Sequence, residues 1–313
     1  MSQTNAEWND YWRQVRRNKM DVDPTGTDAT APFFLAEGPP PHEAKYVIDL
    51  GCGSGPLSGV LSSANYDQSM FVGVDLSIEA AQLMADKDGL SAVQSDLASL
   101  PMMGNTVDWV ISQFALEYAS EVAWQEASRV VRPGGRFTAV MHSVGSFIYE
   151  QHERARSHFL ELDRVIHENH LADFRAQSQH FEGNKRLEQA LAAVKEISRH
   201  QKIGLATPTM DAWIGFINQL LSPSNQQSAI SSEALWDRLL VDYEQFKGRI
   251  DSMLSAALTP VDFMAVQQGF VDAGFDVVTA GLLTIPNGQT MGFKLSAKKA
   301  SDSWCNFFCY AVC

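Results

Sequence analysis

The stretch VIDLGCGSG, residues 47–55, joins a short apolar run to the three glycines Gly51, Gly53 and Gly55. The apolar run predicts a buried strand. Glycine allows left-handed backbone conformations and a close approach of the backbone to a ligand. Pro56 follows, at a position where the first turn of a helix tolerates its missing N–H. The stretch therefore predicts a strand, a tight ligand-binding loop and a helix.

Similar strand signals recur along the chain, with helix-like stretches between them. The apolar segments that follow the first are MFVGVDLS (70–77), WVISQF (109–114), RFTAVMH (136–142), FDVVTAGLL (275–283) and TMGFKLSA (290–297). A helix is predicted over 260–273, before the last two segments. Strands that alternate with helices predict parallel βαβ units in a doubly wound α/β sheet.

Residues 146–258 lack these strand signals, and their apolar residues recur at helical spacing. We expect this helical insertion to interrupt one α/β domain, formed by residues 43–145 and 259–299. The N-terminal segment 1–42 is expected to hold a helix over 6–19 and, over 21–41, a loop rich in Pro, Gly, Thr and Asp.

The last residues, 300–313, contain Cys305, Cys309 and Cys313 at four-residue spacing. The spacing fits packing or dimerisation through one helix face, and also a soft-metal site or a lipid anchor. A tail without function is the simplest interpretation.

The charge of the chain argues against a nucleic-acid substrate. The 313 residues include 24 Lys and Arg against 37 Asp and Glu, a formal net charge of -13. Residues 43–145 alone hold twelve acidic and five basic residues. Phosphate binding needs a basic surface, and no large one is present. Because no apolar run approaches ~20 residues and the first residues are polar, we expect a cytoplasmic protein without a membrane partner.

Two carboxylates help to distinguish a dinucleotide from a nucleoside-type cofactor as the ligand of the glycine loop. A dinucleotide-binding pattern would place a third glycine at position 56, where this sequence has Pro56. Asp75 ends the second predicted strand, where a carboxylate can accept hydrogen bonds from both hydroxyls of a ribose. Asp96 ends the next one and can accept from an adenine amino group. Each of these two residues can also be a helix cap.

Taken in order, VIDLGCGSG, VGVDLS, SDLASLP, DWVISQFALEY and RVVRPGGRF resemble the signature of class I S-adenosylmethionine-dependent methyltransferases. The similarity is greatest to the small-molecule subgroup that includes the ubiquinone/menaquinone methyltransferases. It covers residues 43–142, and the strands at 275–297 are compatible with it. The resemblance implies a Rossmann-like seven-stranded sheet whose last strand is antiparallel, with a large helical insertion after the fifth strand.

The resemblance also implies S-adenosylmethionine as cofactor. Gly51, Gly53 and Gly55 would face its methionine part, Asp75 its ribose, and Asp96 and Leu97 its adenine. The implied cofactor-binding positions are Asp49, Gly51, Cys52, Gly53, Gly55, Asp75, Leu76, Asp96, Leu97, Gln113 and Phe114. Cys52 is also interpretable as a small buried packing residue.

Methyl transfer from a sulfonium is an in-line displacement, which is accelerated by positioning the acceptor and excluding water. A general base is needed when the acceptor must lose a proton. The candidates after the fourth and fifth strands are Glu117, Tyr118 and His142. His142 can equally be an ordinary strand-end histidine, and Glu117 an ordinary helix-start residue.

An insertion after the fifth strand leaves the sheet at its carboxyl edge, where ligands bind in such sheets. We therefore expect residues 146–258 to form a cap over the acceptor. The candidate substrate-binding residues are Trp213, Phe216, Tyr243 and Phe246. Their alternative role is to pack the helices together. The N-terminal helix is expected either to cover the cofactor through Tyr11, Trp12 and Arg16 or to pack plainly on the domain.

The sequence thus predicts a methyltransferase acting on O, N or C of a small molecule held between core and cap, with a homodimer as one possible assembly. Residues 112–115 read Ser-Gln-Phe-Ala and lack the Asn/Asp-Pro-Pro-aromatic motif of many amino-group methyltransferases. A peptide or protein methyltransferase and a non-catalytic, regulatory cofactor-binding module are the alternatives. No metal is expected, because His167 and His170 have no further ligand at recognisable spacing.

Overall fold

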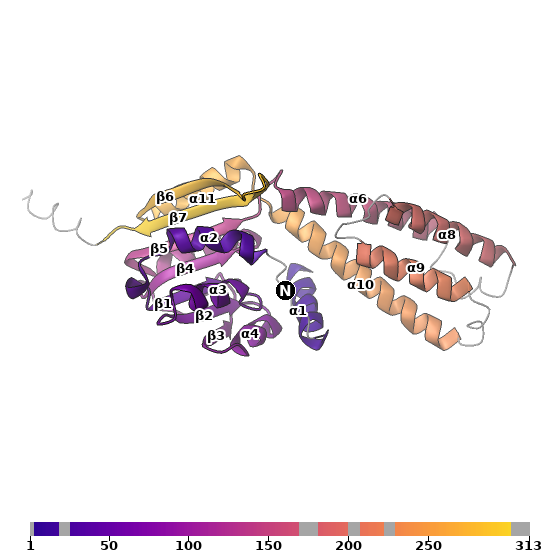
Figure 1. Cartoon of the computed structure of the whole chain (residues 1–313), viewed down its shortest axis with the longest axis horizontal. Coiled ribbons are helices and arrows are strands. Elements are labelled where there is room, and N and C mark those ends of the chain that lie inside the picture. The colour runs from indigo at the N-terminus through magenta and orange to yellow at the C-terminus, as the bar shows by residue number, and fades with distance from the viewer. Residues whose placement is uncertain (1–2, 19–25, 169–180, 200–206, 222–228, 302–313) are drawn as a thin grey trace, which may run out of the picture. The chain divides into compact units, whose positions relative to one another are not determined.

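We describe the fold from a computed structural model, in which residues 3–18, 26–168, 181–199, 207–221 and 229–301 are described. Two compact units make up the chain (Figure 1). The first consists of residues 1–149 and 255–313, and the second of residues 150–254. Cys305, Cys309 and Cys313 lie outside the described residues.

The first unit is built on a seven-stranded sheet with the order β3-β2-β1-β4-β5-β7-β6. Its strands are β1 (Tyr46–Leu50), β2 (Met70–Asp75), β3 (Leu90–Gln94), β4 (Val107–Gln113), β5 (Val131–Met141), β6 (Phe275–Thr284) and β7 (Thr290–Lys299). The first five run parallel, and β7 lies antiparallel between β5 and β6, as the yellow arrows of Figure 1 show. The predicted fold class, with its antiparallel last strand, is confirmed.

Helices cover both faces of this sheet. They are α2 (Thr27–Glu37), α3 (Pro56–Ala64), α4 (Ile78–Ala85), α5 (Glu121–Val130) and α11 (Pro260–Asp272). Side chains alternate along a strand, so Trp109 and Ile111 pack with α2 and α3, whereas Val110 between them packs with α5 and α11. The sheet is therefore buried on both faces, as expected for parallel strands.

The loop predicted over residues 21–41 is wrong for its second half, where α2 forms. Pro32 lies inside α2 and removes one backbone donor, which lowers the intrinsic helix propensity of the segment. The helix nevertheless buries Ala31, Phe33 and Phe34 in the core. Tertiary packing thus overrides the local propensity that the sequence-based prediction used.

The second unit is helical. It is formed by most of α6 (Phe147–Glu168) and α10 (Ala229–Ala256), with α8 (Phe181–Arg199) and α9 (Thr207–Leu221). Side chains from all four helices form one apolar core, which includes Phe159, Val194, Trp213 and Tyr243. The insertion was predicted over residues 146–258. The second unit, residues 150–254, begins and ends four residues inside that range.

Both ends of this insertion are held together by backbone bonds of the first unit. The Leu258 N–H donates to the His142 carbonyl at 2.9 Å, and the Val144 N–H donates to the Leu258 carbonyl at 3.0 Å. The chain therefore leaves the first unit and returns to it at one place, directly after β5.

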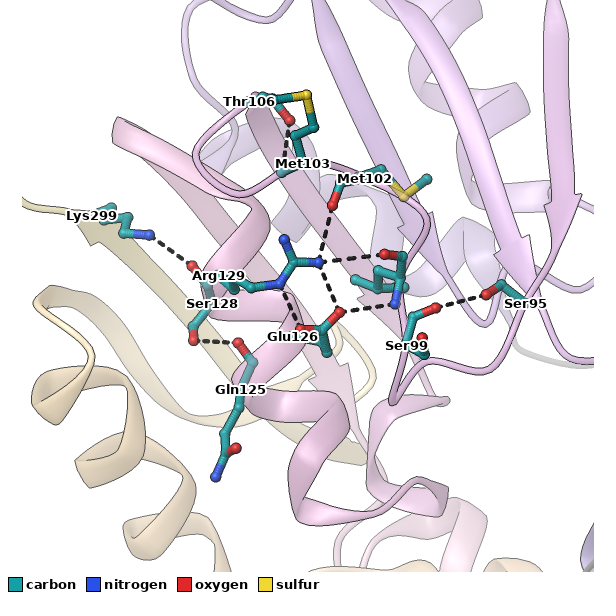
Figure 2. Close-up of polar contacts among 11 residues, drawn as sticks. Ser95, Ser99, Met102, Met103, Thr106, Gln125, Glu126, Ser128, Arg129 and Lys299 are labelled. Carbon is teal, nitrogen blue, oxygen red and sulfur yellow. Dashed lines mark hydrogen bonds and ion pairs between the residues drawn. The ribbon is translucent and has the colours of Figure 1, made fainter.

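Arg129 on α5 fixes the loop that follows β3. Its Nη2 donates to Glu126 at 2.8 Å and to the Met102 carbonyl at 3.0 Å, while the Leu100 N–H donates to Glu126 at 2.9 Å (Figure 2). The guanidinium of Arg129 lowers the pKa of the Glu126 carboxyl through this hydrogen bond. The network secures the chain around residues 95–103, which includes Asp96.

We expect Arg129→Met to lower the free energy of unfolding by about 1 kcal/mol. The variant removes hydrogen bonds from Arg129 to the Leu100 and Met102 carbonyls. The value is discounted because the Arg129 side chain is 39% exposed. Urea titration measures the change. Arg13→Met, which breaks another i,i+3 ion pair with Asp10 at a more exposed position, should change stability by less than about 0.5 kcal/mol. Equal losses in the two variants would contradict the assignment.

Candidate functional site

The glycine loop after β1 has left-handed backbone at each of its three glycines. The φ angles are 67° at Gly51, 52° at Gly53 and 72° at Gly55. A Cβ atom at Gly51 would lie 2.3 Å from Cβ of Ala115, which follows β4. At Gly51 a side chain would be strained by the positive φ and would collide with Ala115. The loop therefore lies against the carboxyl end of β4.

Asp75 at the end of β2 ties this loop to the next helix. Its Oδ2 accepts the Gly53 N–H at 3.0 Å and its Oδ1 accepts the Ser77 N–H at 2.8 Å. Ser77 is in turn the N-cap of α4. Burial raises the pKa of the Asp75 carboxyl, and the backbone hydrogen bonds offset part of that shift. Each carboxylate oxygen keeps a lone pair for a further donor.

Asp49 at the end of β1 is a second buried carboxylate. It is 2% exposed, and Ser58 Oγ of α3 donates to its Oδ2 at 2.7 Å. Burial raises the pKa of Asp49 to about 7. The Ser58 hydrogen bond opposes this shift, and the negative charge of Asp75 adds to it. Asp49 is thus a group that titrates near neutral pH.

Asp96 and Leu97 lie in the loop after β3, two or three residues beyond the strand's end at Gln94. Asp96 is exposed, and its Oδ1 accepts the Ala98 N–H at 2.9 Å. The carboxylate therefore caps its own turn and still faces solvent. Leu97 packs partly against the core, and the Leu76 carbonyl accepts a hydrogen bond from the Gln94 side chain at 3.1 Å.

Gln113 and Phe114 mark the end of β4. The Gln113 side chain is buried and its Nε2 donates to Thr27 Oγ1 at 3.4 Å. Phe114 has a φ of 52°, a strained conformation for a bulky residue. Its ring stacks on His142, with centroids 4.4 Å apart.

The three candidate catalytic residues lie together in the structure. Glu117 Oε1 accepts the backbone N–H of His142 at 2.7 Å, and the rings of Tyr118 and His142 make an edge contact at 5.8 Å. Glu117 Oε2 is buried and has no hydrogen-bond partner in the described part of the chain. Burial raises the pKa of Glu117 to about 7, and burial together with the Glu117 charge raises that of the Tyr118 hydroxyl.

Helix α1 (Gln3–Asn18) places aromatic side chains beside these groups. A Cβ atom at Gly53 would lie 2.7 Å from the Trp12 ring, so the indole packs directly on the glycine loop. Trp8 contacts Tyr11 and Tyr118 edge-on, each at 5.8 Å. Arg16 Nη1 donates to Glu79 of α4 at 2.9 Å. Helix α1 thus covers the loop and borders the candidate catalytic residues.

The remaining predicted residues lie in packed surroundings. Cys52 is buried in the core beside α3, and burial raises the pKa of its thiol. Trp213, Phe216 and Tyr243 are buried in the core of the helical unit, and Phe246 packs against that core. Tyr243 also donates to Asp163, which accepts from Lys247 at 2.7 Å. A substrate-binding role for these four aromatic residues stays a prediction.

Two neighbours of the site were missing from the sequence-based prediction. Ser58, which binds Asp49, follows it by nine residues without any motif that marks the pair. Trp8 lies in the helix predicted over residues 6–19, but nothing in that prediction indicated its contact with Tyr118.

In the described residues, no group of three or more His, Cys, Asp or Glu could hold a metal ion, and no helix is long and apolar enough to span a membrane.

Comparison with known proteins matches the same part of the chain. Residues 48–139, which contain the glycine loop, Asp75, Asp96 and Glu117, match the family described as "Methyltransferase domain". This part of the chain is thus similar in sequence to methyltransferase domains, and it contains strands β2 to β4 and most of β1 and β5 of the sheet.

Proteins similar to this part of the chain have names that state different activities. A malonyl-[acyl-carrier protein] O-methyltransferase of Herminiimonas arsenicoxydans is 34% identical over 131 residues, 42% of this chain and 48% of that protein. The ubiquinone/menaquinone biosynthesis C-methyltransferase UbiE of Syntrophotalea carbinolica is 31% identical over 104 residues, 31% of this chain and 44% of that protein. The chain thus spans less than half the length of these relatives.

Among solved structures, the putative methyltransferase in complex with the Haloferax volcanii Trm112 activator is similar to this chain. It shares 16% sequence identity with a TM-score of 0.49, and the similarity covers 94% of this chain and 98% of that one.

The buried Asp49 of β1 makes the stability of the protein depend on pH. The unfolded chain releases this proton near pH 4, whereas the folded protein holds it up to about pH 7. Between these values the folded state binds more protons, so Asp49 makes the protein less stable as the pH rises.

Asp49→Asn removes this titration. We expect its free energy of unfolding, relative to the original protein, to increase by about 2 to 3 kcal/mol between pH 5 and pH 8. Urea titrations at several pH values test this. Asp67→Asn, at an exposed carboxylate, is the control and should show no such trend. A pH-independent difference for Asp49→Asn would contradict the raised pKa.

Proposed function

We propose that this protein is an S-adenosylmethionine-dependent methyltransferase that transfers a methyl group to O, N or C of a small molecule. The observation that carries the proposal is that the residues matching a methyltransferase domain also form an ordered glycine loop with carboxyl groups beside it. Within residues 48–139, the left-handed glycine loop is fixed by Asp75 and lies beside two further buried carboxyl groups, Asp49 and Glu117.

The residues present fit the proposed cofactor. Gly51 and Gly53 have no side chain and let the methionine part approach the backbone. Asp75 has lone pairs available for the ribose hydroxyls, and the exposed carboxylate of Asp96 can accept from the adenine amino group. Gln113, Phe114 and Leu97 are proposed to complete this cofactor site.

S-adenosylmethionine supplies an activated methyl group on a sulfonium. The chain's own contribution is to orient the acceptor, exclude water and hold or take a proton. Trp8 and Trp12 supply apolar surface beside the glycine loop and Tyr118. Glu117 carries a carboxylate oxygen without a hydrogen-bond partner among the described residues and a pKa of about 7. It is therefore suited to accept a proton from the acceptor at neutral pH.

His142 and Tyr118 position this base. The backbone N–H of His142 holds one oxygen of Glu117, and the ring of His142 is fixed between Phe114 and Tyr118. The raised pKa keeps the Tyr118 hydroxyl protonated, so it can donate a hydrogen bond but does not act as a base near pH 7.

The acceptor is proposed at the level of a small molecule. The two relatives named above methylate oxygen in one case and carbon in the other, according to their names, so they favour no single attacked atom.

We expect Asp75→Ala to weaken S-adenosylmethionine binding by about 10- to 100-fold. The variant removes a charged acceptor from the proposed ribose contact and releases the Gly53 N–H. Isothermal titration calorimetry measures the dissociation constant, with Asp88→Ala, at an exposed carboxylate beyond α4, as the matched control. Unchanged affinity in Asp75→Ala would refute the site, and no binding to the original protein would refute the function.

Glu117→Gln tests the proposed base. Formation of S-adenosylhomocysteine is followed with an acceptor that supports turnover. In the original protein kcat should rise as the pH passes about 7, because Glu117 accepts a proton only when ionised.

The Gln variant should lose this rise and about 10²- to 10⁴-fold in kcat at pH 8, with cofactor affinity unchanged. Glu121→Gln, at the exposed start of α5, is the control. If Glu117→Gln kept both the rate and the pH profile, Glu117 would not be the base.

A further inference from the structure

Two carboxylates flank the glycine loop within the first unit. Asp49 lies on β1, two residues before Gly51, and Asp75 of β2 accepts the N–H of Gly53 inside the loop. They are close enough that the charge of Asp75 acts on Asp49, and both act on the Cys52 thiol between them. The loop thus lies beside two carboxyl groups, one of which titrates near neutral pH.

No positive side chain neutralises this pair in the described part of the chain. The groups that face Asp49 are Ser58 from α3, Asp75 from β2 and Cys52 from the loop. Asp75 receives backbone N–H groups from Gly53 and Ser77. Lys87, which is exposed after α4, lowers the pKa of the Cys52 thiol by less than the two carboxylates raise it, and Arg16 pairs with Glu79.

Buried like charges without a partner raise the free energy of the folded protein. A cation bound beside them lowers it, whereas a neutral ligand of the same shape does not. Such a site therefore binds a cationic ligand more tightly than its neutral counterpart, by an amount that depends on how far the carboxylates are ionised.

We propose that Asp49, together with Asp75, makes the glycine-loop site select the sulfonium S-adenosylmethionine over the neutral thioether S-adenosylhomocysteine, and that Asp49 makes this selection stronger at higher pH. This inference rests on the proposed function. Asp49 is the specificity-determining residue, because it is the nearly fully buried member of the pair and it titrates near neutral pH.

The expected size follows from electrostatics. A preference of about tenfold of the site for the sulfonium when Asp49 is ionised, about 1.4 kcal/mol, sets the scale. With Asp49 half ionised near pH 7, the ratio of the two affinities rises about fivefold between pH 6 and pH 8. Binding of the sulfonium also favours ionised Asp49, so it releases a proton to the buffer.

Calorimetric titration of the full chain with S-adenosylmethionine and S-adenosylhomocysteine at pH 6 and pH 8 tests the proposal. Buffers with different ionisation enthalpies count the protons released. We expect the fivefold rise in the original protein and less than a twofold change in Asp49→Asn. The amino group is common to both ligands, so its titration cancels in the ratio of the two affinities, and the comparison isolates the charge of the sulfonium. Asp88→Asn, at an exposed carboxylate, should behave as the original protein.

Ser58→Ala provides a second variant that keeps the carboxylate. The Ser58 hydrogen bond stabilises ionised Asp49, so its loss should move the rise in the affinity ratio to higher pH. A rise that persists in Asp49→Asn, or an affinity ratio independent of pH in the original protein, would overturn this inference and leave the proposed function standing. Failure of the original protein to bind either ligand would instead refute the proposed function.

Discussion

The hydrogen bond from the Gly53 N–H to Asp75 Oδ2 joins the loop after β1 to the end of β2. The other oxygen of Asp75 accepts the Ser77 N–H, so the same carboxylate also fixes the start of α4. Three left-handed glycines are needed for this bond to form, because the chain must turn sharply between β1 and α3. The position of Trp12 on Gly53, and so the cover that α1 gives to the loop, depends on that turn.

Asp49 and Glu117 lower the stability of the folded protein at neutral and higher pH. Burial raises the pKa of both carboxyl groups to about 7, so each folded carboxyl keeps its proton at a pH where the unfolded chain has released it. Both therefore destabilise the fold as the pH rises. Apolar residues would pack there without this penalty. Asp49 lies in β1 and Glu117 in the turn that follows β4. Under the proposed function, Asp49 acts on the cofactor and Glu117 on the acceptor.

The sequence predicted those parts of the structure that depend on local signals. Apolar runs that end in glycine or aspartate, as at VIDLGCGSG and VGVDLS, define β1 and β2 and their loops because strand, turn and helix start each have their own residue preferences. Helix α2 was missed because its stability comes from burying Phe33 and Phe34, which outweighs the unfavourable Pro32. The contact of Ser58 with Asp49 and that of Trp8 with Tyr118 join separate elements. No local pattern encodes them.

The helical unit is a single insertion in the chain, and none of its residues lies among those of the glycine loop or the candidate catalytic residues. Backbone bonds between residues 142–144 and Leu258 close the first unit before the insertion begins and after it ends. The helices of residues 150–254 bury their own apolar core, with Phe159, Trp213 and Tyr243 at its centre. Substitutions in that core therefore leave the register of β1, β2 and β4, and with it the Asp75 bond, unchanged.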